Sequence, residues 1–525
     1  MTGTFTVNDP PETPPDAGRP IPPRYWWFKR IALACAVLLA ALIGLRWWWG
    51  AVADARLQAA IDKYRQAGQP VYPEDFDAQP VPDEQNAAKT LQEAETALTL
   101  TADQDKLLRD LRDPPASFSE HAFEIGTVVN SNGTSLALLR ESRSKPEVDW
   151  GVRIRSPVAS FLLPNLSGQR RLAKVASAAA VYRHHSDDDA GSIEILRDIQ
   201  SHADTIEAMP TGLIGHLVAI SVSTLGVSAI EQIMPTLRIG GQPESAGVGG
   251  KPARRHQVQA LIAELLDETH LQKGWRSAFY GERTCQLDWA QILSQGKLLI
   301  TPGGGAAAPS LGGRMNAIAV GPMIKLDAIR MMESITALGD SVEKLRYPAA
   351  RKLVPDKPFH RTPVRRFTRL LSEVLTPSYS RALQFHYRAL AYRRMAAVAL
   401  AIRLYELDHG HRPEKLESLV PDHLPALPAD PFAEDDRPFG YRLDLDRPVL
   451  YSVGPDGVDE GGAFGASPGG IFDWDVKDTP FFLNGDRPYS RASTAPASTQ
   501  AGNDDQDVED DEGQADDARH PERDG

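Results

Sequence analysis

The sequence predicts a mainly α-helical protein with an N-terminal transmembrane helix, an α-helical ectodomain of antiparallel helix pairs, and a small C-terminal α+β module. Three observations support this fold class: an apolar run flanked by tryptophans, a long series of helix-period apolar stripes, and two short alternating runs. The predicted divisions are a disordered leader (1–23), the transmembrane helix (24–50), the ectodomain (51–362), the α+β module (363–486) and a disordered acidic tail (487–525).

The first element is an uncharged apolar run from Ile31 to Leu45, followed by Arg46 and three tryptophans. With its aromatic ends the run approaches the ~20 residues that a membrane span needs. Four basic residues precede it (Arg19, Arg24, Lys29 and Arg30), and Arg46 alone follows immediately. Because positive charge stays on the cytoplasmic side, we expect a single-pass protein of the cytoplasmic (inner) membrane. Its N-terminus would be cytoplasmic, residues 24–50 would lie in the lipid bilayer, and the bulk of the chain would be extracytoplasmic.

A cleaved signal peptide is the alternative, since Ala51-Val52-Ala53 has the small-x-small form of a cleavage site. The long leader before the apolar run and the tryptophans directly ahead of that site favour the anchor.

The ectodomain shows one helical stripe after another. Leu172, Val175, Ala179 and Tyr182 form one stripe, and the short loop from His185 to Asp189 predicts an antiparallel partner helix. Helices are expected over 103–112, 119–143, 168–185, 189–208, 213–236, 253–272, 275–297 and 315–345, and from 364 into a long final helix.

That final helix introduces the α+β module. An apolar stripe runs from Tyr387 to Tyr405, Gly410 suits the helix end, and Pro413 prevents its continuation. Two alternating runs follow, with Phe439, Tyr441 and Leu443 on one face of the first and Val449, Tyr451 and Val453 on one face of the second. Residues 444–447 can turn between them, so a β-hairpin is expected to cover the helix.

The order of these signals resembles the C-terminal part of the major pseudopilin of type II secretion systems. The matching stretches are 401–410, 416–421, 424–428, Asp430-Pro431-Phe432, Phe439-Gly440-Tyr441, Leu450 to Gly457 and Gly461-Gly462. The middle of the chain also resembles a group of bacterial single-span membrane proteins that carry such a module on a helical ectodomain, through Asn86-Ala87-Ala88 and Gly281-Glu282-Arg283.

The pseudopilin resemblance implies a structural calcium ion at Asp456. The second carboxylate ligand stays open among Asp459, Asp473 and Asp475, because the stretch 463–471 is longer than in that family. A further departure is Arg412, where the family usually has tyrosine. The alternative is that Gly454-Pro455-Asp456-Gly457 is only a turn signature.

Two other groups of residues invite a metal hypothesis. His184 to Asp189 could supply ligands, but histidine at a helix end and aspartate at the next helix start also suit the helix dipoles. Asp408-His409-Gly410-His411 could do the same, but these residues form a helix end and a loop. His216 lies in an apolar segment and is expected to be a hydrogen-bonded core residue.

Composition excludes several function classes. Of the net charge of −13, the stretch 501–525 carries −9, from eleven acidic residues against two arginines, so the remainder is nearly neutral. No clustered basic face indicates a nucleic-acid partner. No phosphate-binding loop, Gly-x-Ser-x-Gly, His-Glu-x-x-His or paired-cysteine signature occurs, and the two cysteines are expected to be unpaired.

The sequence therefore favours a non-enzymatic scaffold or interaction protein of the cell envelope, with envelope or secretion proteins as partners. One alternative is an extracytoplasmic hydrolase acting on envelope polymers, which would need a deep pocket lined by convergent carboxylates with perturbed pKa values. The other is a subunit of a type II secretion-like machine, against which the N-terminus counts because it lacks a pilin's early glutamate.

Overall fold

The computed structural model describes Gly3 and residues 25–485, except 78, 111–117, 119, 159–165, 211, 241–249, 298, 301–305, 308–310, 343–345, 355–369, 445–446 and 464–477. The expected leader, apart from Gly3, and the expected tail lie outside these residues. So do Asp473 and Asp475, two of the proposed calcium ligands.

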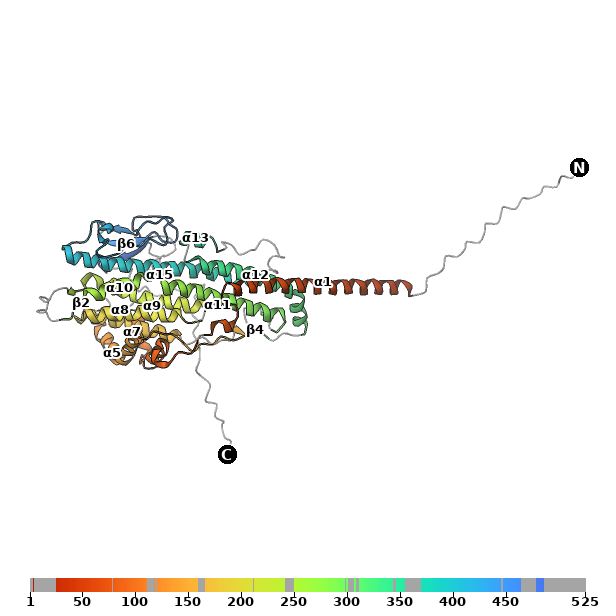
Figure 1. Ribbon diagram of the computed structural model, residues 1–525, viewed down its shortest axis with the longest axis horizontal. Coiled ribbons are helices and arrows are strands. Elements are labelled where there is room, and N and C mark those ends of the chain that lie inside the picture. Colours follow the sequence, from red (N-terminus) through yellow and green to blue (C-terminus); the bar gives the residue numbers. More distant parts are fainter. Residues whose placement is uncertain are drawn as a thin grey trace, which may run out of the picture.

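The molecule is a mainly helical body from which one helix projects (Figure 1). This helix, α1 (Trp26–Gln66), is long and apolar enough to cross a membrane, and the apolar part is not buried in the structure. Such a helix is compatible with a signal anchor or a signal sequence. Its other end belongs to the body, because Leu57, Ile61 and Tyr64 are buried in a cluster with Met332 of helix α12 (Leu311–Ser341).

The body consists of helices that follow one another in sequence and pack together. They are α2 (Ala87–Thr96), α3 (Ala102–Asp110), α5 (Ala122–Ser131), α6 (Gly133–Ser142), α7 (Leu166–His185), α8 (Asp189–Glu207), α9 (Gly212–Ile233), α10 (Arg255–Leu266), α11 (Thr269–Ser294), α12 (Leu311–Ser341), α13 (Tyr347–Arg351) and α15 (Leu370–His409). The predicted helical character of residues 51–362 is thus confirmed in the part of the chain that the structure describes. Apolar side chains from α2 to the C-terminal sheet form one continuous buried cluster.

Two predicted helix boundaries are wrong. The expected helix over 119–143 breaks between α5 and α6 at Asn132, whose side-chain amide hydrogen-bonds both the N–H and the carbonyl of Thr99. The break expected near Gly274 instead falls before Thr269, where Asp267 Oδ1 accepts a hydrogen bond from the Thr269 N–H (3.0 Å). The hydrogen bonds of Asn132 and Asp267 set these two boundaries, and the spacing of apolar residues does not predict such polar contacts.

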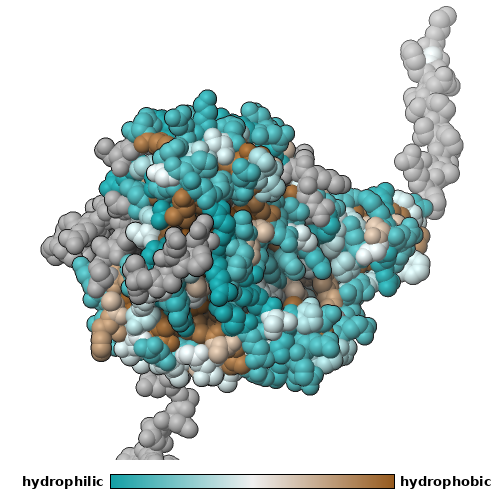
Figure 2. Space-filling view, turned by 60° about the vertical axis from the view of Figure 1, so that its left-hand side comes forward, coloured by the Kyte–Doolittle hydropathy of each residue, from teal (hydrophilic) through white to brown (hydrophobic). Residues whose placement is uncertain are grey.

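Helix α9 is also apolar enough to cross a membrane, but two thirds of its apolar window is buried inside the body. It packs against α7, α8, α11 and α15 and is therefore the central core helix. The face turned forward in Figure 2, which includes the end of the body opposite the projecting part of α1, is mostly hydrophilic with small hydrophobic patches.

The C-terminal module has a three-stranded antiparallel sheet in the order β5 (Gly440–Arg442), β6 (Val449–Ser452) and β7 (Thr479–Phe482). The predicted hairpin is β5–β6, and the third strand was not predicted. The Phe482 N–H of β7 donates a hydrogen bond to Glu231 Oε1 of α9 (2.7 Å), and Asp430 accepts hydrogen bonds from Ser452 Oγ and the Val453 N–H. The hydrogen bond from Phe482 connects the sheet to the helical body, and the hydrogen bonds to Asp430 connect the sheet to the loop that precedes it.

Candidate ligand-binding cavity

A cavity of about 640 Å³ opens between α6, α8, α10 and α11. It is also bordered by the segment 145–148, which a backbone bridge between Asn86 and Glu147 holds against the start of α2. The lining is mostly polar and charged and comes from these separate elements. A ligand in the cavity would therefore contact several helices at once.

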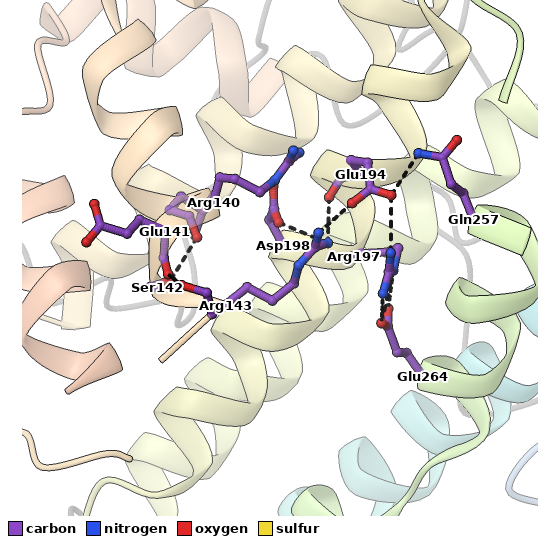
Figure 3. Close-up of polar contacts among 11 residues, drawn as sticks. Arg140, Glu141, Ser142, Arg143, Glu194, Arg197, Asp198, Gln257 and Glu264 are labelled. Carbon is purple, nitrogen blue, oxygen red and sulfur yellow. Dashed lines mark hydrogen bonds and ion pairs between the residues drawn. The ribbon is translucent and has the colours of Figure 1, made fainter. Parts of the chain in front are cut away.

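An ion-pair network forms one wall (Figure 3). Arg143, at the end of α6, pairs with Glu194 and with Asp198 of α8 (3.1 Å to Asp198). Arg197 of α8 pairs with Glu264 of α10 (2.6 Å) and with Glu194 (3.1 Å). Three helices are therefore fixed relative to one another by charges that already have partners.

The electrostatics of this wall follow from its contacts. Burial alone would raise the pKa of Glu194, but hydrogen bonds from Arg143 and Gln257 lower that pKa to about 2. Glu194 therefore stays ionised, and Arg143 and Arg197 do not bring unbalanced positive charge to the cavity. Lys145 pairs with Glu141 at 2.9 Å, and Lys273 and His270 of α11 are further basic residues of the lining.

Two carboxyl groups from the last turns of α8 line the cavity, Asp204 and Glu207, at a spacing of three that places them on one helix face. Burial raises the pKa of both above the usual range, against the opposing effects of Arg393 on Asp204 and of His216 on Glu207. Asp204 lies 3.9 Å from Arg393.

The Glu207 side chain passes α11 at Gly274, which has no side chain to block it. A Cβ built on Gly274 would lie 1.8 Å from Glu207 Oε2, so only glycine leaves room for this side chain. Glu207 Oε2 is 2.8 Å from His216 Nδ1, and His216 Nε2 is 3.1 Å from His386 Nδ1. The carboxyl group of Glu207 on α8, the imidazole of His216 on α9 and the imidazole of His386 on α15 thus form a continuous series of polar contacts that begins at the cavity.

This chain is buried and incompletely hydrogen-bonded. His216 and His386 are 2% and 0% exposed, and both rings pack on Trp275. Burial, with a further effect from His216, holds the pKa of His386 well below its ordinary value. Among the described residues, Glu207 Oε1 and His386 Nε2 have no hydrogen-bond partner. His216 is thus a core residue, as predicted, but its partners could not be foreseen.

The proposed calcium loop is an exposed turn held by local hydrogen bonds. Gly454 to Gly457 forms a turn closed by a Gly457 N–H to Gly454 carbonyl hydrogen bond (3.2 Å), and Asp456 Oδ1 accepts from the Val458 N–H (3.0 Å). Asp459 accepts hydrogen bonds from Tyr451 and the Gly461 N–H. Gly454 to Gly457 therefore form a turn, the local structure that the calcium loop and the simple turn have in common.

Within the described residues, no group of three or more His, Cys, Asp or Glu side chains is placed to hold a metal ion. Two buried carboxylate oxygens near the loop nevertheless have no partner there, Glu460 Oε2 and Asp478 Oδ1. Burial raises the pKa of Asp478 to about 7, against the hydrogen bond from the Gly462 N–H. These orphaned oxygens are compatible with a cation, although the sequence pattern pointed to neither residue.

The histidine and aspartate cluster at 184–189 is a helix junction. His184 Nδ1 is 2.5 Å from Asp189 Oδ1, Arg238 Nε donates to Asp189 Oδ2, and Asp188 caps α8 through the Gly191 N–H. The two cysteines are free, as expected.

No family model, curated protein or solved structure matches this chain. The resemblance to pseudopilins therefore rests on the motif residues of the C-terminal module alone.

Proposed function

We propose that this chain is a single-span membrane protein of the cell envelope whose extracytoplasmic helical body binds a small amine-bearing ligand in the cavity, as an interaction protein rather than an enzyme. The observation that carries the proposal is the charge balance of the lining. The arginines on the wall have carboxylate partners, and the carboxyl groups of Asp204 and Glu207 have one partner each among the described residues, Arg393 at 3.9 Å and the His216 imidazole at 2.8 Å. Lys273 and His270 of α11 also line the cavity.

A ligand ammonium group suits this charge balance. Ionising a buried carboxyl is unfavourable without a positive partner, and burial raises the pKa of both Asp204 and Glu207. An ammonium group beside them would restore the ionised form and form charge-assisted hydrogen bonds. Ser201, Thr205 and Ser277 add polar groups that can accept or donate hydrogen bonds around the ligand.

The test is a thermal-unfolding screen of the full-length protein with small amines, each paired with its N-acetylated analogue. A ligand present at ~100-fold its dissociation constant adds about 2.7 kcal/mol to the free energy of unfolding. We expect some amines to raise the unfolding temperature, their acetylated analogues to have no effect, and Asp204→Asn to abolish the response. Lys145→Ala, which removes an already paired cation, is the matched control. Equal responses to amines and acetylated analogues would refute the proposal.

The C-terminal module is proposed to be pseudopilin-like, to serve contacts with envelope or secretion proteins, and to be stabilised by calcium. Support comes from the order of its motifs, from the long helix α15 beneath a small sheet, and from the partnerless oxygens of Glu460 and Asp478. Asp456 would be one ligand, with Asp459, Asp473 and Asp475 as further candidates.

Hydrolysis of an envelope polymer is a second candidate, because the cavity has some of the features that such an enzyme needs. Asp204 and Glu207 converge on the cavity with raised pKa values. Against this role, Glu264 is ion-paired with Arg197 and the Glu207 side chain is only 5% exposed. Polymer cleavage by wild type that is lost in Asp204→Asn would favour the enzyme; no cleavage alongside ligand binding would exclude it.

The membrane topology is tested by labelling engineered cysteines in intact cells with a membrane-impermeant thiol reagent. We expect Val458→Cys, an exposed site in the C-terminal module, to react from outside and Gly3→Cys to react only after lysis. Reaction of Gly3→Cys in intact cells would contradict the cytoplasmic N-terminus.

A further inference from the structure

The end of the body nearest the projecting part of α1 is built from three helices that meet at one residue. A Cβ built on Gly321 of α12 would lie 3.2 Å from the carbonyl oxygen of Ser294, the last residue of α11, and 3.5 Å from Arg46 Nη2 of α1. Arg46 Nε also donates a hydrogen bond to the Ala319 carbonyl (3.2 Å). Arg46 follows the last residue of the apolar run, so α11 ends close to the level where that run ends. Leu311, the first residue of α12, lies about 12 Å along that helix from Ala319.

The direction of α12 follows from a second contact. Lys325 forms an ion pair with Asp54 of α1. From Arg46 to Asp54 is about 12 Å along α1, and from Ala319 to Lys325 is about 9 Å along α12, at 1.5 Å per residue. The two contacts therefore run in the same direction along both helices. Because Ala319 contacts Arg46 and Lys325 contacts Asp54, the N-terminal turns of α12 lie on the side of the apolar run of α1.

The side chains at this end are those of a membrane interface. Trp47, Trp48 and Met315 are 82%, 63% and 66% exposed. Tryptophan is enriched at the headgroup level of bilayers. The strands β3 (Leu299–Ile300) and β4 (Ala306–Ala307), which follow α11 and pair with each other, contain no charged residue.

We propose that this end of the body, centred on the start of α12, contacts the same lipid bilayer that α1 crosses. The inference rests on the proposed membrane anchor and adds a second, peripheral contact to it. Its occupant is lipid because α1 connects this end to the membrane without a break in the helix. The view in Figure 2, which brings the opposite end forward, shows the mostly hydrophilic surface expected away from lipid.

Two contacts to one membrane would fix the orientation of the helical body relative to the bilayer. A single helix leaves the body free to tilt and rotate, whereas a helix plus an adjoining interfacial surface fixes its orientation. The C-terminal sheet, at the other end of the body in Figure 1, is then held away from the bilayer.

The test uses the full chain in vesicles of mixed zwitterionic and anionic phospholipids, with both native cysteines replaced by alanine. An environment-sensitive fluorophore is attached to Met315→Cys, and quenching is measured with lipids that carry a spin label near the headgroup and, for the embedded reference, with lipids that carry it deep in the acyl chain. Leu38→Cys, exposed within the apolar run, is the embedded reference, and Val458→Cys is the reference for a site away from lipid.

We expect quenching at 315 several-fold above that at 458, and a blue-shifted emission. Quenching at 315 equal to that at 458, with Leu38→Cys strongly quenched, would overturn the peripheral contact while leaving the anchor intact. Weak quenching at Leu38→Cys would overturn the anchor itself and this inference with it.

Discussion

Substituting Gly274 by alanine tests how the cavity is built. In an ordinary helix interior this change stabilises a protein by up to about 1 kcal/mol. Here the new Cβ would lie 1.8 Å from Glu207 Oε2 and 2.5 Å from its carboxyl carbon, so the Glu207 side chain must move. Moving it breaks the 2.8 Å hydrogen bond to His216 Nδ1 inside the body.

The magnitude follows from the hydrogen bond that this movement breaks. Breaking this hydrogen bond leaves the buried His216 nitrogen without its partner, which costs about 1–3 kcal/mol. After subtracting the helix-propensity gain of up to about 1 kcal/mol, Gly274→Ala should lower the free energy of unfolding by roughly 1–2 kcal/mol. The assay is chemical unfolding of the full-length protein in detergent, followed by circular dichroism.

Gly133→Ala is the matched control, because Gly133 begins α6 and a Cβ there would meet nothing within 4 Å. We expect that variant to be unchanged or slightly more stable. The double variant Gly274→Ala/Glu207→Ala should cost less than the sum of the two single changes, since removing the carboxyl removes the clash. Equal behaviour of Gly274→Ala and Gly133→Ala would refute this explanation of how the cavity is built.

Three further results are expected. First, the raised pKa of Asp478, about 7, means that its protonated form is favoured by folding, so its stabilisation is present below about pH 4 and is lost as the pH rises through 7. Asp478→Asn should therefore gain stability relative to wild type as the pH rises from 5 to 8 in the absence of calcium; a constant difference across pH would contradict this. Second, Asp198→Ala should destabilise by about 1.5–3 kcal/mol in urea unfolding because Arg140 loses its carboxylate partner and Arg143 keeps only Glu194, whereas Lys145→Ala should cost under about 1 kcal/mol. Third, calcium should raise the unfolding temperature of wild type and not of Asp456→Ala; no effect of a chelator on wild type would show that the loop is only a turn.

The sequence predicted the helices of the body because their apolar residues recur with helical period, as at Leu172, Val175 and Ala179, all buried. It did not predict the third strand of the sheet. Thr479 to Phe482 contains a proline and pairs with β6 from beyond the segment 464–477, so local pattern gave only the short apolar run Phe481 to Leu483 as a signal.

The cavity could not be predicted for a different reason. Its lining residues come from distant parts of the chain, and its most buried carboxyl, Glu207, depends on a glycine that follows it by more than sixty residues. The only local hint is the spacing of Asp204 and Glu207 on one face of α8. Glu207 and His216 are close in sequence, but their contact with His386 of α15 is set by the packing of α9 against that helix.

The most direct test of amine binding in the cavity is calorimetric titration of an amine ligand into the full-length protein, in buffers of different ionisation enthalpy, between pH 5 and pH 8. Because burial raises the pKa of Asp204 and Glu207, an ammonium group that binds beside them should displace protons. We expect heats that depend on the buffer, net proton release on binding, and loss of that release in Asp204→Asn. Identical heats in all buffers, with an affinity independent of pH, would contradict the proposed binding mode.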